Sequence, residues 1–212
     1  MELNNNTILI TGGTSGFGLE FAKRLLVSSQ FPRLNILINN AGQMRKMNLH
    51  DTSIGLSDVT REVETNLMGP IRMVQAFLPH LKQMDSAAIL NVTSGLALVP
   101  FPIAPIYGAT KSGLRSYTKS LRVQLKNTKI EVFELIAPAA KTPLNDQFVG
   151  MDGFEVKLME PEKIIDAAIK RLKSDTYEIY PGIARVLLMM SRVAPGFILK
   201  QLSKAGARKM AG

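Results

Sequence analysis

Three polar side chains near the middle of the chain have the types and spacing needed to move a proton. Tyr107 and Lys111 are four residues apart, which places both on one face of a helix. A free phenol has a pKa of about 10, and a neighbouring ammonium group lowers that pKa because it favours the phenolate. Ser94 ends an apolar run thirteen residues before Tyr107, and its hydroxyl could hold a carbonyl oxygen while the tyrosine delivers or removes a proton. The pattern predicts proton transfer at an alcohol oxygen, although a Tyr–Lys pair at this spacing is also typical of a solvated helix surface.

A glycine-rich segment near the N-terminus has the features of an anion-binding turn. The apolar residues 7–10 predict a buried strand, and an amphipathic pattern over 18–28 predicts a helix. Backbone amides in a turn between such elements, helped by the helix dipole, point at a pyrophosphate. A glycine pattern alone also fits a plain turn, but its occurrence with the proton-transfer residues favours a dinucleotide site. The turn reads Thr11-Gly12-Gly13-Thr14-Ser15-Gly16-Phe17-Gly18.

The apolar periodicity of the whole chain predicts alternating strands and helices. This alternation is typical of a parallel sheet with helices on both faces, a three-layer α/β/α architecture. The predicted strands lie near residues 6–10, 34–38, 87–93, 130–136 and 177–180, and the predicted helices near 18–28, 57–83, 105–126 and 161–173.

Pro70 interrupts the helical pattern of residues 57–83. Proline has no amide to bond the carbonyl four residues earlier, which belongs to Asn66. We expect a kink that leaves this oxygen free to hold a water beside the active site. The kink would equally be explained if Gly69 and Pro70 separate two helices.

These motifs resemble those of the short-chain dehydrogenase/reductase family, a Rossmann-type family that uses NAD(H) or NADP(H). The chain also has Asn66 and the sequence Asn39-Asn40-Ala41-Gly42 in the family's order. The resemblance implies that Ser94 orients a substrate carbonyl, that Tyr107 is the general acid/base and that Asn66 holds a proton-relay water. It implies that Lys111 binds the nicotinamide ribose and lowers the pKa of Tyr107. The implied cofactor-binding residues are Thr11, Gly12, Thr14, Ser15, Gly16, Phe17, Gly18, Asn39, Asn40, Ala41, Gly42, Tyr107, Lys111, Pro138 and Thr142.

The segment between the glycine turn and the Asn39–Gly42 motif is shorter than the resemblance implies. Residues 19–38 have room for one helix and one strand. By resemblance, the second and third strands and their helices are missing, and with them the residue that distinguishes NAD from NADP. We therefore expect a doubly wound Rossmann-type sheet without these units, with the first strand as an uncovered edge. A direct connection to the next strand would be left-handed, against the usual preference, or would crowd the opposite face.

A second departure follows the strand predicted at 130–136. The family usually has Pro-Gly-x-Val-x-Thr there, whereas this chain has Pro138-Ala-Ala-Lys-Thr142-Pro, so the match at Thr142 is partial. Residues 143–160 have the composition of a substrate lid in which Gly150 and Gly153 permit motion, or of a loop that covers the core. In the lid interpretation, an apolar pocket is lined by Phe148, Met151, Phe154 and Met159.

Composition excludes several other classes of site. The 212 residues are expected to form one globular domain, with a catalytic part at 1–180 and a C-terminal extension at 181–212. The chain has no cysteine, which excludes disulfides, thiol catalysis and cysteine-based metal sites. His50 and His80 have no ligand-spaced partners, so we expect surface or structural roles and no metal. No secretory signal precedes the first predicted strand, which favours the cytoplasm.

Positive charge is concentrated towards the C-terminus. The net charge is +9, and residues 181–212 contribute six basic residues and no acidic one, interleaved with aliphatic side chains. This pattern fits a segment that lies on an anionic membrane surface, or a helical hairpin that covers the substrate cleft or a dimer interface. Arg192 and Pro195 interrupt the pattern, so we expect no transmembrane span. Stacking aromatic residues are not interleaved with the basic ones, so nothing indicates a nucleic-acid partner.

The sequence supports two alternative functions that belong to different classes. The intact set Asn66, Ser94, Tyr107 and Lys111 favours an NAD(P)-dependent oxidoreductase that interconverts an alcohol and a carbonyl group of a small molecule. The missing units favour a catalytically impaired relative that acts as a binding or assembly module. The resemblance implies a homo-oligomer in both cases.

Overall fold

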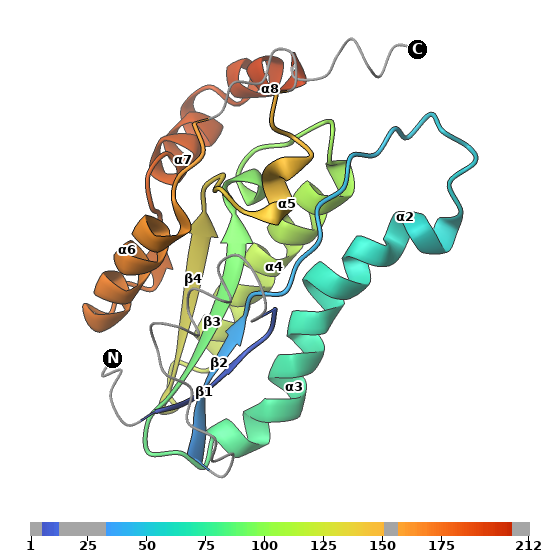
Figure 1. Cartoon of the computed structure of the whole chain (residues 1–212). Coiled ribbons are helices and arrows are strands. Elements are labelled where there is room, and N and C mark those ends of the chain that lie inside the picture. Colours follow the sequence, from blue (N-terminus) through green and yellow to red (C-terminus); the bar gives the residue numbers. More distant parts are fainter. Residues whose placement is uncertain (1–5, 13–32, 151–156, 205–212) are drawn as a thin grey trace.

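A five-stranded parallel sheet forms the centre of the protein. The computed structural model describes residues 6–12, 33–150 and 157–204 of the chain. The strands stand in the order β1-β2-β3-β4-β5, and every neighbouring pair is parallel (Figure 1). The five strands predicted from the sequence are confirmed, and so is the Rossmann-type α/β fold class. Their bounds are β1 Thr7–Ile10, β2 Leu34–Asn39, β3 Ala87–Ser94, β4 Ile130–Ala137 and β5 Glu178–Ile179.

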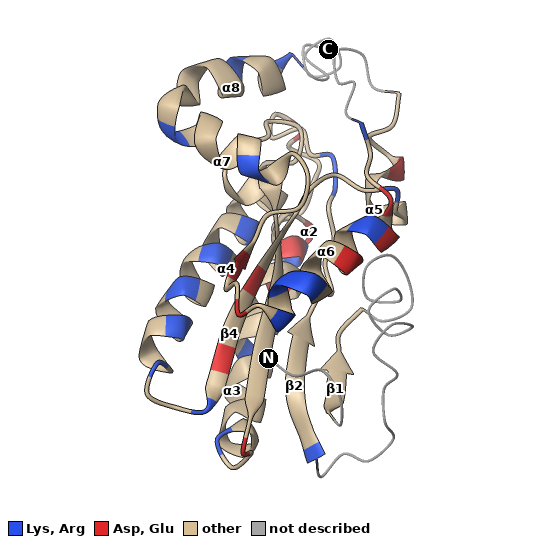
Figure 2. Ribbon diagram, turned by 90° about the vertical axis from the view of Figure 1, so that its left-hand side faces the viewer, with Lys and Arg blue, Asp and Glu red and all other residues tan. Residues whose placement is uncertain are grey.

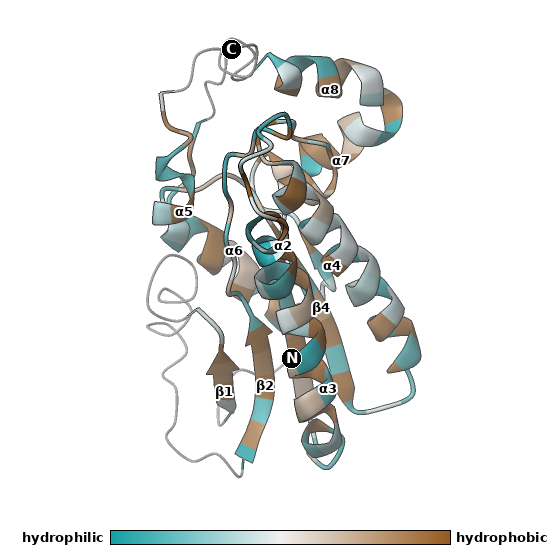
Figure 3. Ribbon diagram, turned by 90° about the vertical axis from the view of Figure 1, so that its right-hand side faces the viewer, coloured by the Kyte–Doolittle hydropathy of each residue, from teal (hydrophilic) through white to brown (hydrophobic). Residues whose placement is uncertain are grey.

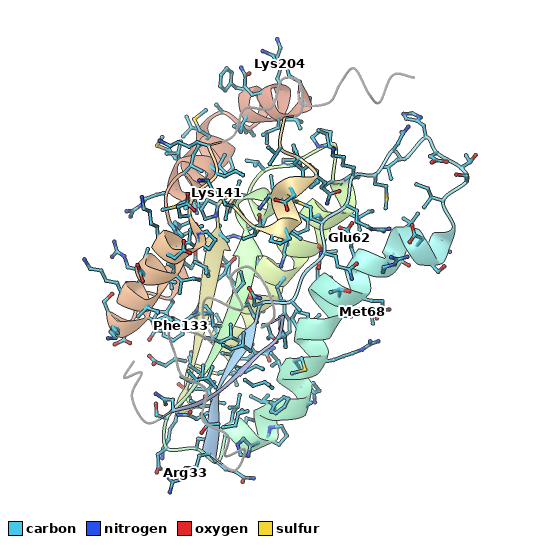
Figure 4. All side chains as sticks on the ribbon, in the orientation of Figure 1. Arg33, Glu62, Met68, Phe133, Lys141 and Lys204 are labelled. Atoms are coloured by element: carbon cyan, nitrogen blue, oxygen red, sulfur yellow. The ribbon has the colours of Figure 1, made fainter. Side chains whose placement is uncertain are left out.

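Helices cover both faces of the sheet, as expected for three layers. Buried side chains of α3 and α4 form one core cluster with the sheet, and those of α6 form another on the opposite face. Within β2, Leu37 belongs to the first cluster and Ile38 to the second, because successive side chains of a strand point to opposite faces. Phe133 of β4, labelled in Figure 4, is fully buried in the second cluster. These helices are α3 Gly69–Leu81, α4 Pro105–Gln124 and α6 Pro161–Lys173.

β1 has one strand neighbour among the described residues. It pairs with β2, and β2 pairs with β3 on its other side. The strand therefore lies at the edge of the sheet, as the short connection predicts, and Figure 3 shows its hydrophobic colouring at this border. The helix predicted at 18–28 and the handedness of its connection lie outside the described residues.

The helical region predicted at 57–83 contains a π-helical segment. α2 (Leu56–Val63) leads directly into the π-helical residues Glu64–Met68, and these lead into α3. The Gly69 amide donates to the Glu64 carbonyl five residues earlier, which is the hydrogen-bond pattern of a π-helix. This irregularity lies where the sequence predicts a kink, and the kink and the free Asn66 carbonyl stay predictions. The helical backbone continues from α2 through it into α3, so no break separates the two helices.

The C-terminal segment forms two helices at the carboxyl ends of the strands (Figure 1). They are α7 (Ala184–Val193) and α8 (Pro195–Ser203), and Pro195 begins α8, where a missing amide is tolerated. Arg185 and Arg192 lie in α7 and Lys200 lies in α8, and Lys and Arg positions are blue on the ribbon of Figure 2. Within residues 6–12, 33–150 and 157–204, no helix has both the length and the apolar composition needed to cross a membrane.

Candidate active site

The ends of four strands contribute to one cavity. The cavity has a volume of about 970 Å³ and is lined at the carboxyl edge of the sheet, where parallel α/β sheets bind their ligands. It brings together most of the site residues predicted from the sequence. These are Gly12 after β1, Asn40, Ala41 and Gly42 after β2, Ser94 at the end of β3, Pro138 and Thr142 after β4, and Tyr107 and Lys111 of α4.

Tyr107 and Lys111 lie on the buried face of α4. Pro105 occupies the first turn of this helix, a position that proline favours. Tyr107 is 5% exposed and Lys111 is 3% exposed. The Lys111 Nζ donates to the Val92 carbonyl of β3 over 2.9 Å and lies 5.8 Å from the centre of the Tyr107 ring. The pair is therefore not part of a solvated helix surface, and that alternative is wrong.

The pKa of Tyr107 is shifted in the direction opposite to the one that the sequence predicts. Burial raises this pKa to about 12, a hydrogen bond with the Ser94 side chain acts against the rise, and the charge of Glu62 adds to it. Burial also lowers the pKa of Lys111 to about 8. The net shift of the Tyr107 pKa is therefore upward, opposite to the expected one, because burial removes the water that would stabilise the phenolate.

Ser94 is positioned by the backbone at the end of β3. Its Oγ accepts a hydrogen bond from the Leu96 amide over 3.1 Å, which caps the short 3₁₀ helix Gly95–Ala97. A serine hydroxyl that accepts in this way keeps its own proton for a second partner. Ser94 and Tyr107 both line the cavity, and their roles towards a substrate oxygen stay predictions.

Arg115 fixes α4 to the sheet one turn beyond Lys111. Its guanidinium group donates to the Glu134 carboxylate of β4 over 2.7 Å. Glu134 is fully buried and also accepts a hydrogen bond from the Thr93 hydroxyl of β3 over 2.6 Å. Burial raises the pKa of Glu134, while the Thr93 bond and the Arg115 charge act in the opposite direction. This ion pair helps to hold the helix that carries Tyr107 against β4, and the Thr93 bond links Glu134 to β3, the strand that ends at Ser94.

The side chain of Asn66 joins the loop after β2 to α4. Its Oδ1 accepts from the Gln43 amide over 2.8 Å, and its Nδ2 donates to the Gln43 carbonyl over 2.8 Å and to Thr110 Oγ1 over 3.2 Å. A Cβ added at Gly42 would lie 3.4 Å from both Asn66 Oδ1 and Lys111 Nζ, so these three residues meet. Asn66 lies beside the site, as predicted, and its side chain makes these contacts. Its role in holding a relay water stays a prediction.

The turns after β1 and β2 are bonded to each other. Thr11 Oγ1 accepts from the amides of Asn40 and Ala41 over 3.0 and 3.1 Å. Gly12 has a φ of +70°, and a Cβ there would lie 3.0 Å from both the Ala41 Cα and the Asn40 side-chain nitrogen. Glycine tolerates this backbone in so little space, whereas other residues are strained by it. The result is close packing of the two turns against each other beside the cavity.

Thr11 and Asn39 do not line the cavity, although the sequence assigns both to the cofactor site. Asn39 is 2% exposed, and its Nδ2 donates to Asn91 Oδ1 of β3 over 2.8 Å. Both side chains thus point away from the cavity, and their hydrogen bonds support the turns whose residues line it. The other assigned residues of the glycine turn, Thr14, Ser15, Gly16, Phe17 and Gly18, lie outside the described residues.

The segment after β4 provides Pro138 and Thr142, as the resemblance implies. Asn145, which the sequence did not single out, donates to Thr142 Oγ1 over 3.4 Å and also lines the cavity. Met159, expected in the pocket, forms a bridge with Ala140 and packs in the core on the α6 side. Its placement in the pocket is therefore wrong, because this bridge turns it towards α6.

Apolar side chains close the cavity beyond Tyr107. Phe148 is buried in the wall as predicted, and its ring centre lies 5.9 Å from that of Phe101. Met44, Phe101 and the residues of the C-terminal helices are part of the wall but resemble ordinary core residues in the sequence. Met151 and Phe154 lie outside the described residues. Four residues of the C-terminal segment line the cavity: Ile183, Leu187, Ile198 and Leu202.

The C-terminal segment therefore covers the cleft, which was one of its two interpretations. Gly95 allows α7 to approach, because a Cβ there would lie 2.9 Å from Cδ1 of Leu187. The other interpretation, contact with an anionic membrane surface, is not tested by these contacts and stays a prediction.

The two histidines have the surface and structural roles predicted for them. His50 is exposed, and the His80 Nε2 lies 2.8 Å from the Leu34 carbonyl oxygen. In the part of the chain that the structure describes, no group of three or more His, Cys, Asp or Glu is placed to hold a metal ion.

Comparisons of the sequence identify relatives that are oxidoreductases. A family model described as short chain dehydrogenase matches residues 26–152. The uncharacterized oxidoreductase DltE of Bacillus subtilis is 31% identical over 224 residues, which cover 84% of this chain and 89% of DltE. The aligned span exceeds the 212 residues of the whole chain, so DltE carries residues within it that this chain lacks. An uncharacterized oxidoreductase of Staphylococcus epidermidis is 28% identical over 71% of this chain, which spans 64% of that protein.

Solved structures have the same fold. A short chain dehydrogenase from Burkholderia cenocepacia in complex with NADP has a TM-score of 0.83 at 21% identity, with 95% of this chain and 99% of that chain covered. A 3-ketoacyl-(acyl-carrier-protein) reductase from Brucella melitensis complexed with NADH has a TM-score of 0.71 at 26% identity, with 83% and 94% covered. Because the family model matches more than half of the chain and DltE is similar over most of its length, this chain belongs to the short-chain dehydrogenase/reductase family.

Proposed function

We propose that this protein is an NAD(P)-dependent oxidoreductase that interconverts an alcohol and a carbonyl group, with Tyr107 as the general acid and base. The observation that carries the proposal is the placement of Ser94, Tyr107 and Lys111 on one cavity, with Ser94 close enough to Tyr107 to act on the pKa of the phenol. The relatives named as oxidoreductases support the same class of reaction.

Ser94 and Tyr107 together handle the substrate oxygen. Because both side chains line the cavity and Ser94 lies near enough to act on the Tyr107 pKa, an oxygen held by one can be reached by the other. The raised pKa keeps Tyr107 protonated at neutral pH, so the phenol can donate its proton as a carbonyl becomes an alcohol. Oxidation of an alcohol requires the reverse transfer, from the substrate hydroxyl to Tyr107.

Lys111 stabilises the phenolate that proton donation leaves behind. Its pKa of about 8 means that most Lys111 side chains are charged at pH 7. The ammonium group is held 5.8 Å from the centre of the Tyr107 ring by its bond to Val92. A cation at this distance favours the ionised phenol.

The turns beside these residues are where a nicotinamide dinucleotide would lie. Gly12 and Gly42 both line the cavity, and the absence of side chains there lets the turns pack closely against Asn40, Ala41, Asn66 and Lys111. Gly12, Asn40, Ala41 and Gly42 would lie along the cofactor, with Lys111 at its ribose and Thr142 at its amide by family resemblance. The bound cofactor supplies or accepts the hydride. The NADP, NAD and NADH complexes of similar folds support this class of cofactor and leave the choice between NAD and NADP open.

A catalytically impaired binding or assembly module is the second candidate function. The edge position of β1 and the short connection before β2 favour it, because by family resemblance the strands missing there would border the adenosine side of the cofactor site. Calorimetric titration with NADH and NADPH separates the two candidates. Saturable binding, followed by oxidation of the bound cofactor in the presence of carbonyl compounds, supports the oxidoreductase. A folded protein that binds neither cofactor supports the module.

Two further expectations are independent of this choice. We expect a homo-oligomer, as the family resemblance implies, which sedimentation equilibrium will test. We also expect the basic C-terminal helices to be the part of the chain that would contact an anionic membrane, which vesicle co-sedimentation will test.

A further inference from the structure

The cavity has one polar and one apolar part. The polar part is formed by the turns after β1, β2 and β4, where the cofactor is proposed to lie. The apolar part begins at Ser94 and Tyr107 and is bounded by Phe101, Phe148 and α8. A substrate whose carbonyl oxygen is held by Ser94 and Tyr107 must place the rest of its atoms in this second part.

α8 closes the apolar part with one face. Leu202 packs against the buried cluster that contains Tyr107, Phe101 and Phe148, so this helix reaches the wall of the catalytic tyrosine. Ile198, one turn earlier, also lines the cavity. Phe197 lies on another side of the helix and is 56% exposed. The α8 residues that line the cavity, Ile198 and Leu202, are thus aliphatic and lie on one face of the helix.

Few charged groups border this space. Among the described residues that line the cavity, Lys111 and Lys157 are charged, and no acidic side chain is present. Lys111 belongs to the catalytic group, and Lys157 is exposed. The hydroxyl groups of a sugar would lose their water here without gaining partners, which is costly. A hydrocarbon group would gain by leaving water for the same surface.

We propose that the substrate is an uncharged carbonyl compound with an extended hydrocarbon group, which lies between the Phe101–Phe148 wall and α8. This inference rests on the proposed oxidoreductase function and adds the substrate class to it. The oxygen of the substrate faces Ser94 and Tyr107, while its hydrocarbon part contacts Leu202 and Ile198. The predicted preference therefore depends on α8 rather than on the catalytic residues.

A series of straight-chain aldehydes from propanal to decanal tests the inference on the unmodified protein. With NADH or NADPH, whichever binds, kcat/KM is expected to rise about fourfold for each added methylene until the space is filled. Glyceraldehyde serves as the polar compound of the same carbon number as propanal and is expected to be the poorer substrate. A kcat/KM that does not rise with chain length, or a preference for glyceraldehyde over propanal, would overturn the inference.

A pair of variants in the C-terminal helices tests the role of α8. Leu202→Glu places a charge in the apolar part, and the ratio of kcat/KM for decanal to that for propanal is expected to fall at least about tenfold. Val193→Glu is the matched control, because Val193 is 78% exposed and does not line the cavity, and its ratio is expected to stay unchanged. If Leu202→Glu does not fold by circular dichroism, Leu202→Ala takes its place with a smaller loss in the same direction. An unchanged ratio in a folded Leu202 variant, or an equal loss in the Val193 variant, contradicts the inference.

The outcomes separate this inference from the function on which it rests. No saturable binding of NADH or NADPH, or no cofactor oxidation with any carbonyl compound, is a failure of the proposed function. Cofactor oxidation with kcat/KM independent of chain length is a failure of the substrate class alone.

Discussion

Asn66 and Thr110 join the π-helical segment to the helix that carries Tyr107. The Asn66 Nδ2 donates to Thr110 Oγ1 over 3.2 Å, and Thr110 Oγ1 donates to the Tyr107 carbonyl over 2.8 Å. The same amide holds the Gln43 backbone in the loop after β2. One buried side chain thus fixes the cofactor-side loop and the catalytic helix relative to each other.

Replacement of Asn66 by alanine is therefore expected to affect both stability and rate. The change removes three hydrogen bonds and leaves the Gln43 backbone groups without these partners, so the free energy of unfolding should fall by roughly 2–4 kcal/mol. Urea unfolding followed by circular dichroism measures this loss. Asn48→Ala is the control, because its side chain accepts from the His50 amide in an exposed loop, and its effect should stay within about 0.5 kcal/mol. Equal effects of the two substitutions would show that Asn66 has no joining role.

Gly12 is expected to be irreplaceable by alanine. Its φ of +70° and the 3.0 Å approach to Ala41 leave no unstrained place for a methyl group. Gly12→Ala should cost about 1–2 kcal/mol of stability and weaken cofactor binding, as measured by thermal unfolding and by calorimetry. Gly196→Ala is the matched control, since a Cβ there meets nothing within 4 Å, and it should leave cofactor binding unchanged without lowering stability, because alanine is a better helix former than glycine within α8. Wild-type cofactor affinity in Gly12→Ala would exclude this turn from the cofactor site.

Lys111 gives the stability of the cofactor-free protein a defined pH dependence. Its pKa is lowered from 10.5 to about 8 by burial, so between these values the unfolded state binds more protons than the folded state. Stability from this group must therefore rise with pH from about 8 to 10.5, by roughly 3 kcal/mol in total. Tyr107 acts in the opposite sense at higher pH, because its pKa is raised from 10.0 to about 12.

Comparison with Lys111→Met isolates this contribution. Urea unfolding of both proteins between pH 7.5 and 9.5 should show that the stability of the wild type increases relative to that of the variant as the pH rises. A difference that stays constant over this range would mean that the ammonium group is not desolvated in the folded protein.

The strands and the grouping of Ser94, Tyr107 and Lys111 on one cavity could be predicted from the sequence for identifiable physical reasons. Ser94 ends an apolar run, and the ends of such runs become the carboxyl edge of a parallel sheet. Tyr107 and Lys111 are separated by one helical turn, so their common face follows from the local geometry. The short connection before residue 34 likewise predicted that β1 lies at an edge.

Other features depend on contacts that no local pattern reveals. Leu202 belongs to the site only because α8 folds back over the sheet, more than ninety residues after Tyr107 in the sequence. The direction of the pKa shift of Tyr107 depends on burial, whereas the spacing of Lys111 shows only that a cation is near. Asn39 lies in a recognisable motif, yet its side chain turns inward to Asn91 of the adjacent strand.

The measurement that tests the central claim most directly is carbonyl-dependent oxidation of NADH or NADPH by Tyr107→Phe. This substitution removes the phenolic hydroxyl and keeps the buried ring, so the fold and the cofactor affinity should be retained. The account predicts that kcat falls by about 10²–10⁴-fold, the typical contribution of a general acid. A Tyr107→Phe protein that is folded, binds cofactor and reduces the same substrate at the wild-type rate would contradict it.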